Sequence, residues 1–439
     1  MPEKWILKQY QALPLRAKVQ MSMNRIREWY NHFNGNVCVS FSGGKDSTVL
    51  SHLVHDLYPD VPLVFVNTGL EYPEIQEFAR KMGAEFLRPK KSFSEVISEY
   101  GYPIISKEVG EAIYYARRIV PKTAGSLETL ERERESSYSK QKEDRTGGTA
   151  SQRVAAPPAT ESNTEEGRSE RNTTSLRGRT GWRRANLTAN TPPPKTDWHD
   201  WRRKSIAGVE EGYTGSSQFN KKKWLPLCQE TQFLISSSCC SVMKKSPIGI
   251  YQRKHKVYPY IGTLAEESRM RLQAWVRHGC NSFDGKKKTS QPLSFWTEQD
   301  ILRYILDEGL EIASVYGNIV AVDENGYEYE PYITAGCNLK CTGCQRTGCI
   351  FCGFGAHLEK GETRFQRLAK THPRQYEYCL GGGQWVDNPK YDPTAPKMDG
   401  DWENWNPKQI WVPSKQGLGM KKVFDDCNQI YGKDFIRYD

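Results

Sequence analysis

Residues 37–57 read VCVSFSGGKDSTVLSHLVHDL, and this stretch decides the fold. Val37 to Phe41 form a short run rich in β-branched residues, of the kind found in a buried parallel strand. From Ser47 to Leu57, apolar residues recur at helical spacing. A loop with two glycines lies between them. The stretch therefore predicts a strand, a tight loop and a helix in direct succession.

The same alternation continues along the chain. Residues 62–66 form a second apolar run, residues 72–82 suit a helix with a proline in its first turn, and residues 84–87 give a third strand. An amphipathic helix is expected before them, over 15–33. Strand, helix, strand, helix, strand predicts the α/β class with a doubly wound, mostly parallel sheet.

Further elements of the same kind are expected after residue 224, where the chain becomes apolar and aromatic again. Residues 256–261 resemble a strand and residues 264–277 a helix. Thr297 followed by Asp300 has the pattern of a helix start. We therefore expect one α/β domain built from two separated halves of the chain.

The loop Ser42-Gly43-Gly44-Lys45-Asp46-Ser47 has the composition of an anion site. It lies at the carboxyl end of the first strand, where open α/β sheets bind ligands. Paired glycines let backbone N–H groups close around an anion, and the helix N-terminus adds its dipole. Lys45 supplies a positive charge, while Ser42 and Ser47 offer hydroxyl groups. The spacing differs from a Walker A loop, so another type of phosphate-binding loop is predicted.

The motif SGGKDS resembles the PP-loop of the adenine nucleotide alpha hydrolase-like superfamily, which includes ATP pyrophosphatases and phosphoadenosine phosphosulfate (PAPS) reductases. Three further segments resemble the reductase branch: VNTGLEYPE at 66–74, IGTLAEESRMR at 261–271 and PLSFWTEQDI at 292–301. The resemblance implies an adenine nucleotide with its phosphates on the loop. It implies catalytic roles for Lys45 and Asp46, and nucleotide contacts from Ser42, Gly43, Gly44, Lys45, Asp46, Ser47, Thr68, Glu71 and Arg269. With ATP, Asp46 would also help to position Mg²⁺.

Twelve cysteines in a chain whose first residues have no apolar export signal favour metal or redox chemistry over disulfides. Five of them lie between Cys337 and Cys352, which indicates a soft metal site. A structural zinc held by the last four is one alternative. The spacing from Cys337 to Cys344 also matches a radical-SAM motif.

The cysteines resemble those of adenylyl-sulfate reductases, in which a Cys-Cys pair and a distant Cys-x-x-Cys ligate a [4Fe–4S] cluster. Mapped onto this chain, the resemblance implies four ligands, with Cys344 as a substitute for one of them. The implied ligands are Cys239, Cys240, Cys349 and Cys352.

One part of the reductase pattern is missing. PAPS reductases carry a C-terminal Glu-Cys-Gly-Leu-His segment, and the nearest residue here is Cys427, flanked by acidic residues that would raise its pKa. Two reactions therefore stay open. The first reduces PAPS or adenylyl sulfate to sulfite with a thiol electron donor. The second uses ATP to adenylate and thiolate a nucleic acid. A non-catalytic nucleotide or cluster sensor is a third interpretation.

Composition sets the remaining expectations. The net charge of +10 allows a nucleic-acid partner, and no apolar stretch is long enough for a membrane span, so a cytoplasmic protein is expected. Residues 121–200 contain no Ile, Phe or Met and predict a disordered, low-complexity insertion. The expected layout is a helical segment at 1–34, a PP-loop half at 35–120, the insertion at 121–200, a second half at 201–336, a Cys-rich cluster module at 337–360 and a Trp- and Gly-rich tail at 361–439.

Overall fold

The computed structural model describes residues 3–117, 206, 221–284, 288–332, 337–395 and 404–439. The predicted insertion at 121–200 lies outside these residues. The chain divides into two compact units. One comprises Met1–Tyr114, Gln232–Val386 and Gln409–Asp439, and the other comprises Tyr115–Thr231 and Asp387–Lys408. The predicted phosphate loop and the predicted metal ligands all belong to the first unit.

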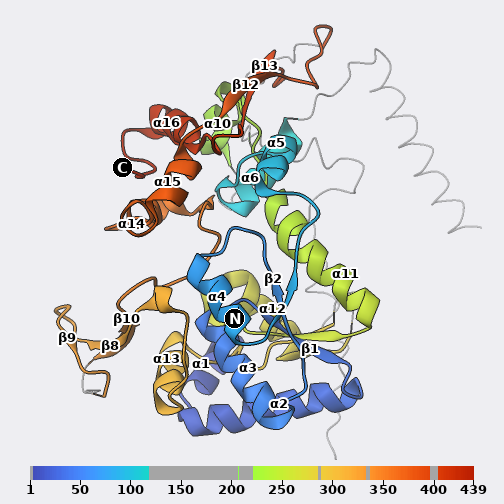
Figure 1. The fold of residues 1–439 in the computed structure, drawn as a ribbon, viewed down its shortest axis with the longest axis vertical. Coiled ribbons are helices and arrows are strands. Elements are labelled where there is room, and N and C mark those ends of the chain that lie inside the picture. Colours follow the sequence, from blue (N-terminus) through green and yellow to red (C-terminus); the bar gives the residue numbers. More distant parts are fainter. Residues whose placement is uncertain (1–2, 118–205, 207–220, 285–287, 333–336, 396–403) are drawn as a thin grey trace, which may run out of the picture. The chain divides into compact units, whose positions relative to one another are not determined.

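A six-stranded sheet forms the centre of the first unit, in the order β3-β2-β1-β5-β7-β6. Its strands β1 and β2 are labelled in Figure 1. Neighbouring strands pair in parallel except β6 and β7, which are antiparallel. This confirms the predicted α/β fold with a mostly parallel sheet. The strands are β1 (Val37–Phe41), β2 (Leu63–Val66), β3 (Glu85–Leu87), β5 (Tyr258–Ile261), β6 (Asn281–Ser282) and β7 (Thr289–Ser290).

The central strands come from distant parts of the sequence. Val39 of β1 aligns with Leu63 on one side and with Tyr260 of β5 on the other. Because β1 lies between β2 and β5, the loops that follow β1 and β5 meet at the same edge of the sheet. Both halves of the chain therefore contribute to that edge, as the sequence predicted.

The longer helices in the two halves of the domain are α1 (Glu3–Gln11), α2 (Leu15–His32), α3 (Lys45–Leu57), α4 (Pro73–Lys81), α5 (Phe93–Tyr100), α6 (Lys107–Ala116), α11 (Ser246–His255), α12 (Arg269–His278) and α13 (Glu298–Asp307). Of these, α2, α3 and α11 contact strands of the central sheet. The expected helix over 264–277 begins later, at Arg269. A 3-10 turn (η5, Ala265–Glu267) precedes it, and Ser268 caps its first turn.

Smaller elements complete the structure. Strands β8 (Ile319–Val322), β9 (Glu328–Tyr329) and β10 (Asn338–Cys341) form one sheet in the order β10-β8-β9 (Figure 1). Strands β4 (Ile104–Ile105) and β11 (Gly353–Phe354) pair in parallel. The other elements are η3 (Lys222–Trp224), α10 (Leu225–Glu230), η4 (Cys240–Lys245), η6 (Ser314–Tyr316), η7 (Ala356–Leu358), α14 (Arg364–Thr371), α15 (Pro373–Leu380), β12 (Gln384–Asp387), β13 (Gln409–Val412) and α16 (Met420–Tyr431).

The Cys-rich segment is attached at both ends to elements from elsewhere in the sequence. The Gln299 amide on α13 bonds to the backbone of Leu339 in β10, at 2.9 Å and 2.7 Å. At the other end, Gly353 of β11 aligns with Ile104 of β4. These two attachments hold the intervening cysteines within the first unit. Of the helices described, none combines the length and apolar character needed to cross a membrane.

A buried ion pair joins α2 to α13. The Lys18 ammonium, whose side chain is 2% exposed, donates to both carboxylate oxygens of Asp300 at 2.7 and 2.8 Å. Asp300 also accepts from the backbone N–H of Thr297, as the sequence pattern predicted for this helix start. The pair thus ties the N-terminal helices to the second half of the domain.

Replacing Lys18 with Met should lower the free energy of unfolding by about 3 kcal/mol or more, because Asp300 would be left as a buried charge without its cation. Lys81→Met is the matched control. Lys81 pairs with Glu311, and both of these side chains are more than half exposed. That change should cost less than about 1 kcal/mol. Chemical denaturation measures both values, and equal losses in the two variants would contradict the role given to Lys18.

Candidate functional site

The SGGKDS loop follows β1 directly and leads into α3. Gly43 has a positive φ of 70°, and a side chain there would lie 2.8 Å from the Ile75 side chain. The Ser47 hydroxyl donates to the carbonyl of Gly44 at 2.8 Å and accepts from the backbone N–H of Ser42 at 3.2 Å. These bonds, which lie within the loop itself, hold it closed.

Lys45 is the first residue of α3, and its side chain is almost completely buried. Its ammonium donates to Glu298 Oε1 at 2.9 Å. It also lies 5.4 Å from the centre of the Tyr316 ring, within the range of a cation–π contact. The Lys45 charge also acts on the Cys341 thiol and lowers its pKa, although burial raises that pKa overall. The loop lysine therefore has partners from α13 and η6.

A cleft of about 730 Å³ opens at this edge of the sheet. That volume lies in the range of sites that bind nucleotide-sized molecules. Its walls come from the loop, from the segment after β5, from the start of α13 and from the Cys-rich segment. They are Ser40, Ser42, Gly44, Lys45, Asp46, Ile261, Gly262, Thr263, Leu264, Glu266, Glu267, Arg271, Glu298, Tyr316, Gln345, Arg346 and Thr347.

Asp46 lies on the cleft wall beside Lys45. Burial raises the pKa of its carboxyl group, and the positive charges of Lys45, Arg346 and Arg271 act in the opposite direction. The two arginines come from different elements, so the fold gathers three cations around one loop carboxylate.

Glu267 interacts with both Arg271 and Arg346, and its carboxylate forms an ion pair with each of them. Burial lowers the pKa of Arg271, and the nearby Arg346 guanidinium lowers it further. Two like charges that converge in this way favour a shared anion between them.

The sequence did not identify these arginines. It selected Arg269, whose side chain is exposed and is absent from the cleft wall, whereas Arg271 lies on that wall. Arg346 lies between Cys344 and Cys349, which the sequence analysis considered as metal ligands. Glu298 lies between Thr297 and Asp300, which the sequence analysis interpreted only as the start of a helix. Both arginines nevertheless lie in segments that the sequence analysis singled out, Arg271 in residues 261–271 and Arg346 between Cys344 and Cys349.

Thr68 and Glu71, at the end of β2, bond to each other instead of lining the cleft. The backbone N–H and the hydroxyl of Thr68 donate to the Glu71 carboxylate at 2.8 to 3.0 Å. Glu71 also pairs with Lys244, whose ammonium is 3.3 Å from Oε1. The Lys244 ammonium in turn hydrogen-bonds to the Cys349 sulfur. A chain of polar contacts thus runs from β2 to the cysteines.

The four predicted ligands influence one another's pKa, and their role as metal ligands stays a prediction. A hydrogen bond to the Cys240 sulfur raises the pKa of the Cys239 thiol, and burial raises it further. The charges of the Cys352 and Cys349 thiols also raise the pKa of Cys239. The hydrogen bond from Cys239 lowers the pKa of Cys240. Residues from both halves of the domain therefore converge here.

These thiols fit a soft metal centre in type. Lys107 and Lys244 also lower the pKa of Cys240, so cations are present to offset thiolate charge. Across the described part of the chain, however, no three His, Cys, Asp or Glu side chains are already arranged to hold a metal ion. The side chains would have to turn toward one another for a cluster to bind.

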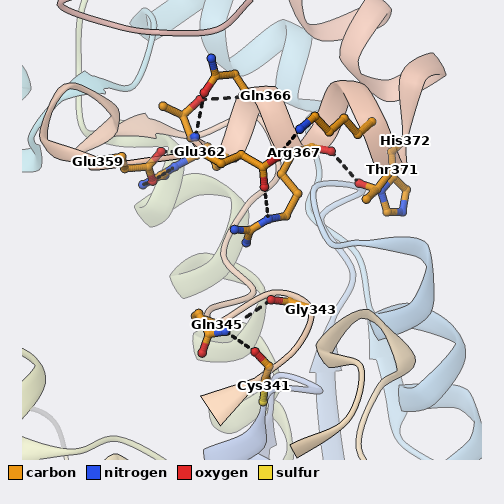
Figure 2. A network of polar contacts seen from close by, with 12 residues as sticks. Cys341, Gly343, Gln345, Glu359, Glu362, Gln366, Arg367, Thr371 and His372 are labelled. Carbon is orange, nitrogen blue, oxygen red and sulfur yellow. Dashed lines mark hydrogen bonds and ion pairs between the residues drawn. The ribbon is translucent and has the colours of Figure 1, made fainter. Parts of the chain in front are cut away.

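Cys341 and Cys344 have other neighbours. The charge of Lys45 acts on Cys341, and Cys344 hydrogen-bonds to the Tyr72 hydroxyl and to the Arg367 guanidinium. Figure 2 shows the Gln345 side chain folded back over this turn, where its amide donates to the carbonyls of Cys341 and Gly343.

Cys427 does not lie at a surface. It is fully buried in α16, and burial together with the charge of Asp426 raises the pKa of its thiol. A thiol in this setting is a poor nucleophile, as the sequence indicated.

The cleft depends on a close approach at Gly262, where a side chain would lie 2.9 Å from the backbone carbonyl of Asp46. Gly262→Ala should therefore displace the loop and lower the free energy of unfolding by about 1 to 3 kcal/mol. Gly249→Ala is the control, because Gly249 lies in α11 and the nearest atom to its added methyl would be 3.6 Å away. Thermal denaturation compares them, and an unchanged melting temperature for Gly262→Ala would contradict the tight packing.

Comparison with known proteins agrees with this geometry. The family model for the phosphoadenosine phosphosulfate reductase domain matches residues 36–124 and 206–353. Two uncharacterized proteins of Methanocaldococcus jannaschii are similar to this chain. The first is 37% identical over a stretch that covers 18% of this chain and 18% of its own length. The second is 30% identical over 19% of this chain and 22% of its own length. The adenosine 5'-phosphosulfate reductase of Staphylococcus haemolyticus is 29% identical over 22% of this chain and 42% of its own length.

The chain therefore spans less than half the length of each of these curated relatives. The family match, in contrast, covers more than half of this chain and includes the loop, the cleft wall after β5 and the cysteines up to Cys352. The chain belongs to the phosphoadenosine phosphosulfate reductase family.

Proposed function

We propose that this protein binds an adenine sulfonucleotide, either PAPS or adenylyl sulfate, in the cleft and reduces it to sulfite. The observation that carries the proposal is the convergence of Lys45, Arg271 and Arg346 on a cleft of about 730 Å³ that the SGGKDS loop lines. Three cations from separate elements suit a ligand with several anionic groups. The family match and the similarity to an adenosine 5'-phosphosulfate reductase support the same substrate class.

Each loop residue has a role in this proposal. The backbone of Gly43 and Gly44 and the hydroxyls of Ser42 and Ser47 bind phosphate oxygens. Lys45 leaves Glu298 to bind the anionic group that reacts. Asp46 orients the nucleotide, and with ATP it would bind Mg²⁺.

Thr68, Glu71 and Arg269 are weaker members of the proposed site. Thr68 and Glu71 act through Lys244, which connects them to the cysteines. Arg269 would reach a nucleotide only from the outer surface, because its side chain is exposed.

The proposed cofactor is a [4Fe–4S] cluster held by Cys239, Cys240, Cys349 and Cys352. When bound, such a cluster supplies a redox centre whose potential depends on the hydrogen bonds and charges around its sulfurs. Lys244 is the residue that would tune it, because its ammonium contacts both Cys349 and Glu71. Zinc on the same segment is the alternative.

One observation favours a second function. The cleft wall carries four carboxylates, from Asp46, Glu266, Glu267 and Glu298, against the three cations. ATP arrives with Mg²⁺, which would offset these carboxylates. The second candidate is therefore an ATP pyrophosphatase that activates and thiolates a nucleic acid. A sensor that binds nucleotide without turnover is the non-catalytic alternative.

Product analysis separates these functions. Protein purified without oxygen would be incubated with PAPS, with adenylyl sulfate or with ATP and Mg²⁺, each with a dithiol, and the nucleotide products identified by mass spectrometry. Sulfite together with the desulfated nucleotide supports the proposal. AMP and pyrophosphate from ATP, with both sulfonucleotides unchanged, would establish the second function, and binding without any product would leave the sensor.

Lys45→Met should weaken sulfonucleotide binding at least tenfold, since a charge-assisted hydrogen bond contributes about 1.5 to 3 kcal/mol. Glu298→Gln is the informative partner. It removes the carboxylate that holds Lys45 at 2.9 Å, so sulfonucleotide affinity should stay the same or increase. Calorimetric titration without divalent metal measures both. If Glu298→Gln bound the sulfonucleotide more weakly, the result would contradict this expectation and would favour the second function, in which the ligand is ATP with Mg²⁺.

Cys240→Ser and Cys352→Ser should each lose most of the bound iron and acid-labile sulfide, because each removes a proposed ligand. Cys337→Ser is the control, since Cys337 lies in the same segment outside the proposed ligand set. Iron analysis and the visible absorption spectrum of anaerobic protein provide the measurement. Zinc in place of iron in the unaltered protein would overturn the cluster assignment.

A further inference from the structure

Two hydroxyl groups meet in the wall of the cleft, next to the phosphate loop. The hydroxyl oxygens of Tyr316 and Thr347 lie 2.6 Å apart, and both residues line the cleft. A side chain on Gly44 would come within 3.3 Å of the Tyr316 oxygen and within 3.8 Å of the Thr347 oxygen. The hydroxyl pair therefore lies beside the residue at which the loop ends and α3 begins.

Backbone contacts hold the two residues in place. Tyr316 belongs to η6, and its carbonyl accepts from the N–H of Gly343 at 2.8 Å. The carbonyl of Val315 accepts from the N–H of Cys344 at 2.9 Å. A side chain on Gly343 would lie 2.4 Å from the Val315 carbonyl oxygen, so the turn is packed tightly against η6. The residues that follow this turn, 345–347, line the cleft.

Tyr316 and Thr347 differ in exposure and in their other contacts. The tyrosine is 2% exposed, and its ring lies 5.4 Å from the Lys45 ammonium, whereas the threonine is partly exposed. Burial raises the pKa of the Tyr316 hydroxyl, so this group keeps its proton and remains a donor. A bond between two hydroxyls uses only one of their two hydrogens. When Tyr316 donates to Thr347, the Thr347 hydrogen is left to point at a ligand.

An anion at the loop would meet this hydrogen. Gly44 is the N-cap of α3, and the N–H groups at a helix N-terminus attract phosphate and sulfate groups. Because the Thr347 oxygen lies so close to the side-chain position of Gly44, an anion at Gly44 can contact the backbone and this hydroxyl together. Hydrogen bonds to charged oxygens are stronger than those between neutral groups. The pair thus adds a neutral donor to the three cations of the cleft.

We propose that Thr347 binds an anionic group of the nucleotide through its hydroxyl, and that Tyr316 is the positioning residue that orients this hydroxyl. This inference rests on the proposed function, because it takes the ligand of the cleft to be a nucleotide whose phosphate or sulfate groups lie at the loop. It gives the Cys-rich segment a second contact with that ligand, besides Arg346.

Variants of Thr347 test the direct contact. Thr347→Val removes the hydroxyl at nearly constant side-chain volume, and it should weaken binding of adenylyl sulfate or PAPS about tenfold or more, the loss expected for a hydrogen bond to a charged group. Thr347→Ser keeps the hydroxyl and should bind like the unaltered protein. Calorimetric titration without divalent metal measures the affinities. Thr347→Ala takes the place of Thr347→Val if the valine variant does not fold.

A double-mutant cycle tests the role of Tyr316. Tyr316→Phe keeps the ring beside Lys45 and removes only the hydroxyl, so affinity should fall less than in Thr347→Val. In the Thr347→Val background, Tyr316→Phe should cause no further loss, because the hydroxyl that it orients is already gone. A merely structural role would weaken binding in both backgrounds, and additive losses would overturn the positioning role.

Thr342→Val is the control from the same segment. The Thr342 hydroxyl accepts from the N–H of Asn318 at 3.0 Å, and this residue is not among those that line the cleft. The change should leave nucleotide affinity as it is in the unaltered protein. Thermal denaturation of every variant identifies any that is misfolded.

The outcomes distinguish the two claims. If the unaltered protein binds a sulfonucleotide and Thr347→Val binds it equally well, the proposed function stands and the hydroxyl assignment fails. Equal losses in Thr347→Val and Thr347→Ser would also overturn the assignment. If the unaltered protein binds only ATP with Mg²⁺, the proposed function fails, and titration of the same variants with ATP decides the assignment. A protein that binds none of these nucleotides would overturn both claims.

Discussion

The position of the Lys45 ammonium is the constraint on which the rest of the site depends. This charge is almost completely buried, and it is held by the Glu298 carboxylate and the Tyr316 ring. A buried ammonium needs such partners, because burial without them would be costly. The partners come from two elements that lie far from the loop in sequence. The lysine therefore organises the cleft wall, and a bound anion has to compete with Glu298 for it.

Backbone packing makes this arrangement possible. The loop can adopt its shape because Gly43 has a positive φ, and the segment after β5 can approach because Gly262 has no side chain to meet Asp46. The parallel pairing of β1 with β5 places both segments at one edge. The same edge receives the Cys-rich segment through the contact of Gln299 with Leu339. Three separate parts of the chain therefore converge at this edge of the sheet.

The sequence predicted what depends on local pattern. Alternating strands and helices predicted the sheet, and the glycines with Lys45 predicted the loop between β1 and α3. The four cysteine ligands that the resemblance to adenylyl-sulfate reductases implies stay a prediction. Arg271, Arg346 and Glu298 were missed because their roles arise from contacts across the fold. Arg269 was chosen from the resemblance of residues 261–271 to the reductase branch, whereas Arg271 is the arginine of that segment that lines the cleft. Cys341 and Cys344 have neighbours that differ from those of the four predicted ligands, and the spacing of the cysteines in the sequence does not reveal this difference.

The most direct test of the account is an anaerobic crystal structure of the protein with a bound adenine sulfonucleotide. The account predicts that the phosphates lie on the SGGKDS loop and that Lys45 has turned from Glu298 to the sulfate group. A nucleotide bound away from the loop, or one whose sulfate group points away from Lys45, would contradict it.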